Sequence, residues 1–267
     1  MTPLLTATDG PVVTLTIDRP AAGNAINLEL ATAIRAAARD AIADPGCAAM
    51  VLAASGRVFC AGGDLGSIAG AADVQGHLRE LALILHEAMA LLRESRLVVV
   101  AAVAGAAAGA GFALALNADL VVAGQSARFL AAYSTMGLTP DTGMSYLLPR
   151  VVGAHRATEL TLLGRALDAR TAQEWGIVNE VVADAAVGSR AAELARVVAN
   201  GPRPAIAETK RLLRAGATDP AGAADSFRRH LDEEARVIVE AAVSEDARER
   251  MRMFLARAGK PAASAVG

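Results

Sequence analysis

The sequence predicts an α/β fold in which helices cover a largely parallel sheet. Short apolar runs, such as residues 12–18 and 97–103, alternate with longer segments of helical periodicity over the first two thirds of the chain. This order is typical of layered α/β proteins. Apolar residues make up 54% of the 267 residues and charged residues 20%, which excludes a disordered chain and supplies a sizeable core.

The expected elements follow from periodicity and from glycine and proline punctuation. They are a strand at 12–18, a helix at 28–42 stopped by Pro45-Gly46, a strand at 48–53, a glycine-rich loop at 55–67, a helix at 73–93, a strand at 97–103, a turn and short helix to 118, a strand at 120–123, a helix at 142–148 and a strand at 176–182. Because the strands are short and apolar, we expect helices to cover at least one face of the sheet.

The pattern becomes purely helical near the C-terminus, with helices expected at 185–199, 204–214 and 221–255. We therefore divide the chain into a core of residues 1–200 and a helical region of residues 201–267. The second region is too small to form a stable core of its own, so we expect it to pack on the core or on a neighbouring subunit.

Charge and cysteine content exclude several classes of protein. With 26 basic and 28 acidic residues the net charge is −2, so no global positive field is available for nucleic-acid binding. Two cysteines, Cys47 and Cys60, cannot form a disulfide framework, and the four histidines show no metal-site spacing. Residues 1–9 lack the features of a signal peptide. We expect a cytoplasmic protein without a metal site.

An uncharged run at 97–116 has the length of a membrane span and contains Gly105-xxx-Gly109, the spacing of a helix-dimer face. However, much of the run is alanine and glycine, and it divides into a β-branched half and a glycine-rich half. We predict a strand, a turn and a helix here, and no membrane insertion.

Two glycine-rich turns carry the first indication of chemistry. The turn at 109–111 lacks the third glycine of a dinucleotide fingerprint because Leu114 stands there, and the segment at 143–147 lacks the closing glycine of a nucleophile elbow. The turns at 60–64 and 108–111 can both present free backbone N–H groups, which would form an oxyanion hole if the turns face each other. Tight turns that merely require small residues explain the same pattern, and the residues alone leave both readings open.

Several motifs in order identify a resemblance over nearly the whole chain. These are Arg19-Pro20 with Asn24-Ala25-Ile26-Asn27, then FCAGGDL at 59–65, GAG at 109–111, GLTPDTG at 137–143 and LPR at 148–150. Together they resemble the crotonase superfamily of enoyl-CoA hydratases and isomerases. The resemblance implies a spiral of ββα units followed by a helical trimerisation region, and assembly as a homotrimer or a dimer of trimers.

The resemblance also implies an acyl-CoA site, with coenzyme A entering as part of the substrate and no separate cofactor. It places an oxyanion hole on the N–H groups of Gly63 and Ala110, where alanine replaces the family's usual glycine. It places the CoA moiety along Ala25, Ala61, Asp64 and Leu65, and an aromatic side chain lent to a neighbouring subunit at Phe254. Gly23 stands where many relatives carry a basic residue near the CoA phosphates, so we expect Arg57 or Lys260 to supply these contacts instead.

The departures from the family decide the expected mechanism. The two glutamates of typical hydratases align with Ala113 and Tyr133, so the usual acid and base for water addition are absent. Asp141 is the carboxylate that remains, and it resembles the single catalytic acid of some Δ3,Δ2-enoyl-CoA isomerases, including those of phenylacetate breakdown. The spacing alone favours Asp141 as the N-cap of a helix at 142–148, and the resemblance favours a catalytic role instead.

Two further residues remain as alternatives. His86 aligns with the water-activating histidine of 4-chlorobenzoyl-CoA dehalogenase, but its apolar helical neighbours also fit a packed histidine. Tyr133 falls where that dehalogenase has tryptophan, and its phenol can line an acyl pocket or bind a substrate.

We therefore predict an acyl-CoA-processing Δ3,Δ2-enoyl-CoA isomerase. The alternatives are a hydratase with unusual acid and base residues, an acyl-CoA hydrolase or dehalogenase with Asp141 as nucleophile and His86 as base, and a non-catalytic acyl-CoA binder.

Overall fold

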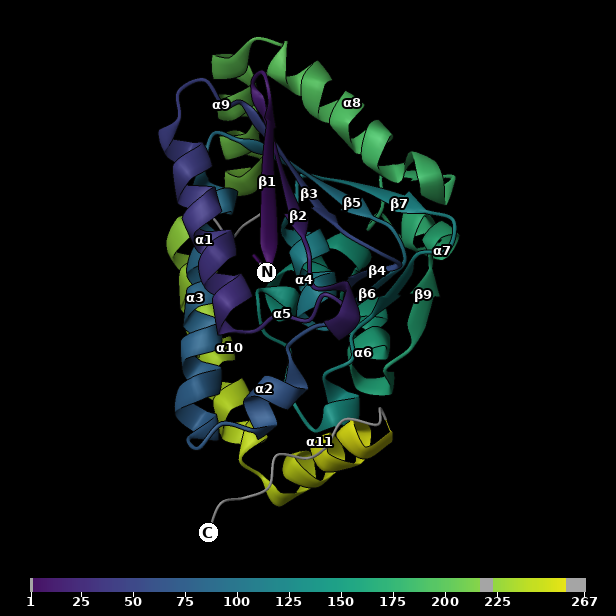
Figure 1. The fold of residues 1–267 in the computed structure, drawn as a ribbon. Coiled ribbons are helices and arrows are strands. Elements are labelled where there is room, and N and C mark those ends of the chain that lie inside the picture. The colour runs from purple at the N-terminus through teal and green to yellow at the C-terminus, as the bar shows by residue number, and fades with distance from the viewer. Residues whose placement is uncertain (1, 217–222, 258–267) are drawn as a thin grey trace.

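The computed structural model describes residues 2–216 and 223–257, with side chains for residues 2–214 and 227–257. It confirms the α/β class, because two sheets occupy the centre of the molecule and helices surround them (Figure 1). The larger sheet contains β1 (Leu4–Asp9), β2 (Val12–Ile17), β3 (Ala49–Ala54), β5 (Val98–Val103), β7 (Leu120–Gly124) and β10 (Glu180–Val182), paired in that order. Only the β1–β2 pair within it is antiparallel.

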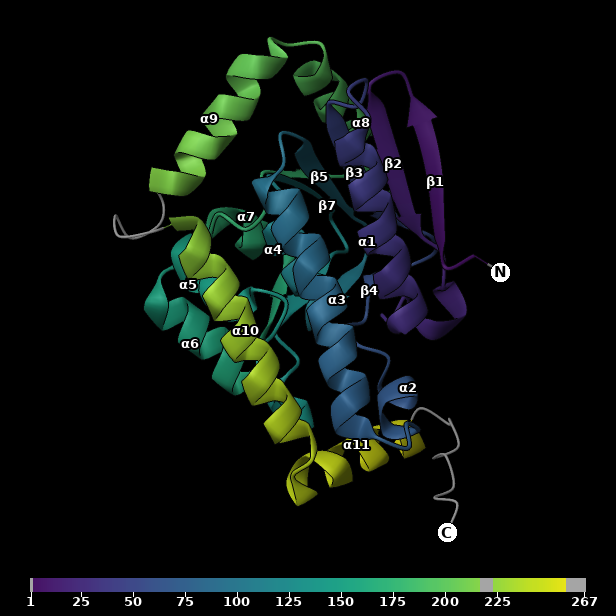
Figure 2. The same cartoon turned by 90° about the vertical axis from the view of Figure 1, so that its left-hand side faces the viewer.

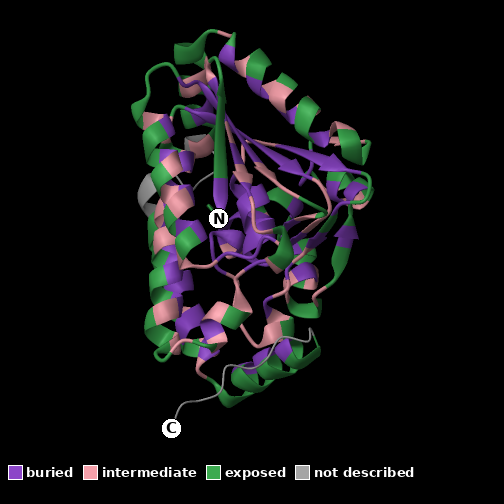
Figure 3. Ribbon diagram, in the orientation of Figure 1, coloured by how far each residue is buried: buried purple, intermediate pink, exposed green. Residues whose placement is uncertain are grey.

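Side chains alternate between two apolar layers along the larger sheet, as the period of two of a β-strand requires. Leu15, Met50 and Val99 point into the main core beneath α1 (Leu28–Ala43), α3 (Val74–Glu94) and α4 (Ala110–Asn117). Val51 and Val100 point to the opposite face, which α8 (Val187–Ala199) covers. Figure 3 shows that the central strands of this sheet and α4 are buried, whereas the edge strand β1 and the outer side of α8 are exposed.

A second, smaller sheet produces the spiral. It contains β4 (Val58–Cys60), β6 (Ala106–Ala108), β8 (Arg128–Leu130) and β9 (Ala166–Asp168), paired in that order. Strands β3, β5 and β7 of the larger sheet are each followed at once by a strand of the smaller one, so the chain repeats ββα units. The expected loop at 55–67 was therefore wrong in part, because it contains β4 and the start of α2 (Leu65–Ala69).

The uncharged run at 97–116 forms β5 and most of α4, as predicted, but the segment expected as a turn contains the short strand β6. Among the residues that the structure describes, no helix is long and apolar enough to cross a membrane. The other helices of the core are α5 (Met144–Val152), α6 (Ala154–Leu163) and α7 (Ala169–Glu174), with short 3₁₀ turns at Pro20–Ala22, Ser134–Met136 and Asp184–Ala186.

The C-terminal region is helical, as expected, and two of its helices reach the core. It comprises α9 (Arg203–Gly216), α10 (Ala223–Ala242) and α11 (Glu245–Arg257), so the single helix expected at 221–255 is broken near Ser244. Helix α10 lies along α3, and α11 crosses below both (Figure 2). Helix α9 extends away from the body and is tied to it by Lys210, which forms an ion pair of 2.8 Å with Asp119. The division into residues 1–200 and 201–267 stays a prediction.

Candidate functional site

A cavity of about 300 Å³ lies between the small sheet, α3 and the C-terminal helices. Most of its wall is aliphatic, with Leu78, Leu81, Ala82 and Leu85 contributed by one face of α3. Spacing of three and four residues places these four side chains on the same side of the helix. Of the described residues that line the cavity, Asp141 alone carries a carboxylate, and none of them is basic. The cavity is therefore suited to an uncharged, apolar group.

The two glycine-rich turns face each other at the mouth of this cavity. A Cβ atom built on Gly62 would lie 3.6 Å from the backbone nitrogen of Ala110, and one built on Gly109 would lie 3.7 Å from the Gly62 Cα. Gly62 has φ +100° and Gly109 has φ +51°, conformations that a side chain disfavours. Gly111 permits the close approach, because a Cβ there would lie 2.2 Å from the Cys60 carbonyl oxygen. The small residues thus serve both turn geometry and close packing.

The backbone N–H groups of Gly63 and Ala110 line this mouth. Neither is paired with an acceptor in the part of the chain that the structure describes. Ala110 is the first residue of α4, whose N-terminus carries a partial positive charge. Two such donors on facing turns provide the elements of an oxyanion hole.

Asp141 lies at the same cavity and is only 7% exposed. Its Oδ1 atom accepts a hydrogen bond of 2.6 Å from the Tyr133 hydroxyl and one of 3.1 Å from the Thr142 hydroxyl. Because both bonds are made to Oδ1, the Oδ2 atom of Asp141 is available to take a proton from a substrate. The N-cap reading of Asp141 was wrong, because α5 begins at Met144 with Gly143 as its N-cap.

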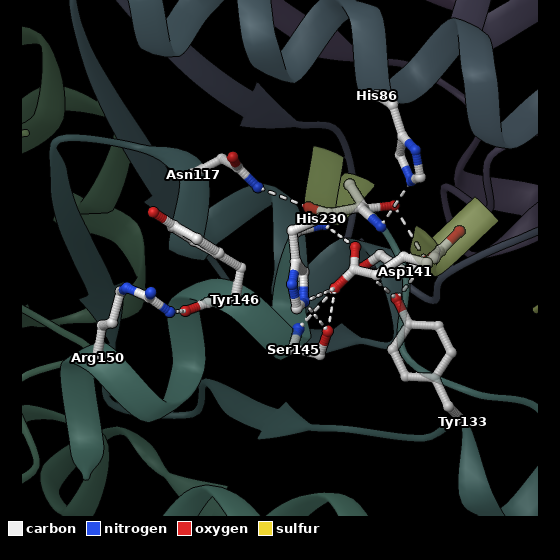
Figure 4. A network of polar contacts seen from close by, with 11 residues as sticks. His86, Asn117, Tyr133, Asp141, Ser145, Tyr146, Arg150 and His230 are labelled. Atoms are coloured by element: carbon white, nitrogen blue, oxygen red, sulfur yellow. Dashed lines mark hydrogen bonds and ion pairs between the residues drawn. The ribbon is translucent and has the colours of Figure 1, made fainter. Parts of the chain in front are cut away.

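Tyr133 is buried beside Asp141 and below the oxyanion turn, where a Cβ on Gly109 would lie 4.0 Å from its Cζ atom. Burial, with the neighbouring charge of Asp141, raises the pKa of Tyr133 well above its ordinary value. The hydroxyl therefore stays protonated and donates a hydrogen bond to the carboxylate. Figure 4 shows Tyr133 and His86 pointing toward the Asp141 turn from different sides.

The residue after Asp141 has an unusual backbone. Thr142 has φ +57°, which is rare for a β-branched residue and costs about 1–3 kcal/mol. Three hydrogen bonds fix it: its N–H donates to His86 Nε2 at 3.0 Å, its carbonyl accepts from Asn117 Nδ2 at 2.8 Å, and its hydroxyl donates to Asp141. This conformation directs the Asp141 side chain into the cavity.

His86 is buried behind the Asp141 turn and is not among the residues that line the cavity. Because Nε2 accepts a hydrogen bond from Thr142, the ring is neutral with its proton on Nδ1. Burial lowers the pKa of His86, although the nearby charge of Asp141 opposes the shift. His86 thus orients the turn, and its Nε2 lone pair is already engaged.

Glu234 is a residue of this site that sequence reasoning missed. Its carboxylate accepts from the N–H groups of Gly143 at 2.7 Å and Ser145 at 2.9 Å, and from the Ser145 hydroxyl. Burial raises the pKa of Glu234 to about 7, although these donors favour the charged form. Phe227, Leu231 and Ile238 continue the same face of α10, so a glutamate within an apolar stripe was the available signal.

The structure places the remaining predicted residues as follows. Ala61, Leu65 and Phe254 line the cavity, with Phe254 48% exposed. Ala25 and Asp64 do not line it: the Ala25 carbonyl accepts from Arg19, and the Asp64 carboxylate pairs with Arg19 at 2.9 Å and caps α2. Arg57 is exposed, and Lys260 lies outside the described residues. Searching the described residues finds no group of His, Cys, Asp and Glu that could hold a metal ion.

Comparison with known proteins agrees with this geometry. The sequence profile described as "Enoyl-CoA hydratase/isomerase" matches residues 7–261. The chain is 36% identical over 220 residues to the 1,2-epoxyphenylacetyl-CoA isomerase of Escherichia coli K12, covering 81% of this chain and 83% of that protein. It is 40% identical over 248 residues to a protein named "Probable enoyl-CoA hydratase" of Rhodobacter capsulatus, covering 90% of both.

A solved structure gives the same result for the fold. The crystal structure of an enoyl-CoA hydratase from Bacillus halodurans superposes with a TM-score of 0.84 at 27% identity, covering 94% of this chain and 99% of that one. The predicted ββα spiral is thereby confirmed.

Proposed function

The chain belongs to the enoyl-CoA hydratase/isomerase family, and from this premise we propose that it is a Δ3,Δ2-enoyl-CoA isomerase. One observation carries the proposal: among the described residues, a single carboxylate, that of Asp141, lines the apolar cavity, together with two backbone N–H groups that have no acceptor there, those of Gly63 and Ala110. A 1,3-proton shift needs one base and one site for negative charge, whereas the family's water addition uses two carboxylates. Ala113 and Tyr133 stand where that pair would be.

The reaction begins with the thioester oxygen bound between the N–H groups of Gly63 and Ala110. The free oxygen of Asp141 removes a proton from C2 of the 3-enoyl thioester, and the electron pair moves into a dienolate whose oxygen the two N–H groups stabilise. The same carboxyl group then returns its proton to C4, so the double bond moves from C3–C4 to C2–C3. Atoms and charge balance without water or a second acid.

The cavity defines the substrate class as a neutral, apolar acyl chain. Its wall carries no basic group among the described lining residues, so a negatively charged acyl group would lose its hydration without a partner there and would lie near the Asp141 carboxylate. We assign the CoA moiety to the part of the cavity wall that Ala61 and Leu65 form. Assembly as a homotrimer or a dimer of trimers, and a cytoplasmic location, also belong to this proposal.

The hydrolase alternative is less compatible with the position of His86. A water-activating base needs a free nitrogen facing the reacting carbon. In this chain His86 Nε2 accepts from the Thr142 N–H, and the ring lies behind the turn. A hydratase stays as the second candidate, favoured by the name of the Rhodobacter relative.

The test is incubation of the purified protein with a 3-enoyl-CoA and, separately, with a 2-enoyl-CoA, with products followed by mass. An isomerase converts the 3-enoyl thioester without a change of mass. Addition of one water to the 2-enoyl thioester would instead identify a hydratase. Binding of both without turnover would identify a non-catalytic acyl-CoA binder and contradict the proposal.

Tyr133→Phe is expected to lower kcat for isomerisation by about tenfold with little change in KM. The phenylalanine fills the same space but removes the 2.6 Å hydrogen bond that orients Asp141, and a bond to a charged group contributes on the order of 1.5–3 kcal/mol. Steady-state kinetics on a 3-enoyl-CoA measures the change. Tyr146→Phe is the matched control, because it also removes a buried phenol but lies outside the cavity wall. Equal kcat values for the two variants would show that Tyr133 does not orient the base.

A further inference from the structure

The turn that carries Asp141 is held from behind by a helix of the C-terminal region. A Cβ on Gly143 would lie 3.0 Å from the Phe227 ring, so α10 packs directly against the turn. Ile238 of the same helix reaches the cavity wall. Helix α10 therefore contacts both the substrate cavity and the reverse side of the Asp141 turn.

Glu234 supplies the polar part of this contact. Gly143 and Met144 begin α5, a helix whose first N–H groups have no partners within the helix. The N-cap, Gly143, has no side chain to satisfy them. The Glu234 carboxylate replaces the missing cap from 91 residues away, since Oε2 accepts from the Gly143 N–H and Oε1 from the Ser145 N–H.

These bonds act on the backbone that sets Asp141. Gly143 directly follows Thr142, whose φ of +57° is unfavourable without support from its surroundings. His86 and Asn117 fix the N–H and the carbonyl of Thr142, and Glu234 fixes the next N–H along the chain. Loss of this last bond leaves the peptide group between Thr142 and Gly143 held only at its carbonyl, by Asn117.

We propose that Glu234, which touches neither the substrate nor the cavity, is a positioning residue that holds the Asp141 turn in the conformation needed for proton transfer. This inference rests on the proposed isomerase function and deepens it, because it makes the helical C-terminal region part of the catalytic apparatus. A displacement of a catalytic group by about 1 Å can reduce the rate on the order of 10²-fold.

The groups that face Glu234 indicate a pH dependence. Asp141 and Tyr133 approach Glu234 from the Asp141 turn, and His230 lies on α10, the helix that carries Glu234. Arg150 of α5 lies near His230, and the His86 ring faces the Asp141 turn from α3. Burial and the charge of Asp141 both raise the pKa of Glu234, to about 7, and burial, with the charge of Arg150, lowers the pKa of His230. Protonation of Glu234 as the pH falls through about 7 weakens its bonds to the two N–H groups.

Protein stability is expected to depend on pH in the opposite direction to activity. The folded-state pKa of Glu234 is raised from 4.5 to about 7, so between these values the folded protein binds more protons than the unfolded chain. The contribution of this group to stability is then present below about pH 4.5 and is lost as the pH rises through about 7. Activity, which uses the charged form, instead rises over this range.

Glu234→Gln tests the proposal, because the amide retains the size of the side chain but points a donor at one of the two N–H groups. Glu233→Gln is the matched control, since Glu233 is the adjacent residue and its side chain is 58% exposed, paired with Arg236. On a 3-enoyl-CoA we expect kcat of the Glu234→Gln variant to fall by about tenfold or more with KM within about threefold. We also expect the acid limb of kcat near pH 7 to disappear. A kcat and a pH profile equal to those of Glu233→Gln would overturn the proposal.

A second variant tests the positioning role of Glu234 if the Glu234→Gln protein does not fold. Glu234→Asp keeps the negative charge but shortens the side chain by one methylene, so its carboxylate can no longer accept from both N–H groups, and a fall in kcat of about two- to fivefold at unchanged KM is expected. An unchanged kcat would overturn the proposal. A wild-type protein inactive on every 3-enoyl-CoA would contradict only the proposed function. A crystal structure of the Glu234→Gln variant then tests the positioning role, which a moved Asp141 supports and an unmoved Asp141 excludes.

Discussion

Asp141→Asn is expected to reduce kcat for 3-enoyl-CoA isomerisation by ~10²–10⁴-fold, the range that a general acid–base group contributes. Asparagine has the same shape as aspartate and its Oδ1 can still accept from the Tyr133 and Thr142 hydroxyls. The amide cannot take up a proton from C2 at neutral pH. The turn, the cavity and acyl-CoA binding are therefore expected to persist while the chemical step is lost.

Conversion of the 3-enoyl thioester, followed by mass-resolved chromatography or by absorbance of the conjugated product, measures this effect. Asp40→Asn is the matched control, because Asp40 lies on the exposed face of α1 away from the cavity. Binding of a saturated acyl-CoA to both variants shows that the site has kept its shape. If Asp141→Asn isomerised as fast as Asp40→Asn, the base would lie elsewhere.

Ala110→Pro is expected to reduce kcat by ~10²–10³-fold, the usual effect of removing one oxyanion donor. Proline is tolerated at the first position of a helix, where its missing N–H has no partner within the helix. Ala110 occupies that position in α4, with an unpaired N–H facing the cavity mouth. The substitution thus removes the proposed donor from a backbone that accepts proline.

Ala110→Gly is the control for this variant, because glycine keeps the N–H and restores the residue typical of the family. We expect it to retain activity within about threefold of the wild type, since the donor belongs to the backbone. Single-turnover rates with enzyme in excess separate the chemical step from binding. A proline variant as active as the glycine variant would show that the Ala110 N–H does not bind the thioester oxygen.

Much of the fold was predictable because local patterns agree with the final structure. The amphipathic spacing of α3 and α1 and the β-branched run of β5 specify their elements without reference to distant contacts. The three-residue strands β4, β6 and β8 were not predicted. Strands this short carry too few residues to show a period of two, and pairing with distant segments defines them.

The residues of the candidate site likewise divide into those that local motifs predict and those that distant contacts define. Gly63, Ala110 and Asp141 were predicted from compact motifs that resemble the family, and Tyr133 from its alignment with a tryptophan of the dehalogenase; the structure brings all four to one cavity. The position of His86 behind the turn and the whole role of Glu234 depend on contacts across 56 and 91 residues, respectively. No motif of adjacent residues records such contacts. They follow only from the packing of α3 and α10 around the Asp141 turn.

The central claim is that one carboxyl group carries the same proton from C2 to C4. The most direct measurement is a single turnover, with enzyme in excess, of a 3-enoyl-CoA that carries two deuterons at C2, in ordinary water. Because Asp141 is buried in an apolar cavity, we expect it to return the deuteron it removed, giving a 2-enoyl product that keeps both labels. A product one mass unit lighter from the first turnover would show that solvent or a second acid protonates C4, and would contradict the single-carboxylate mechanism.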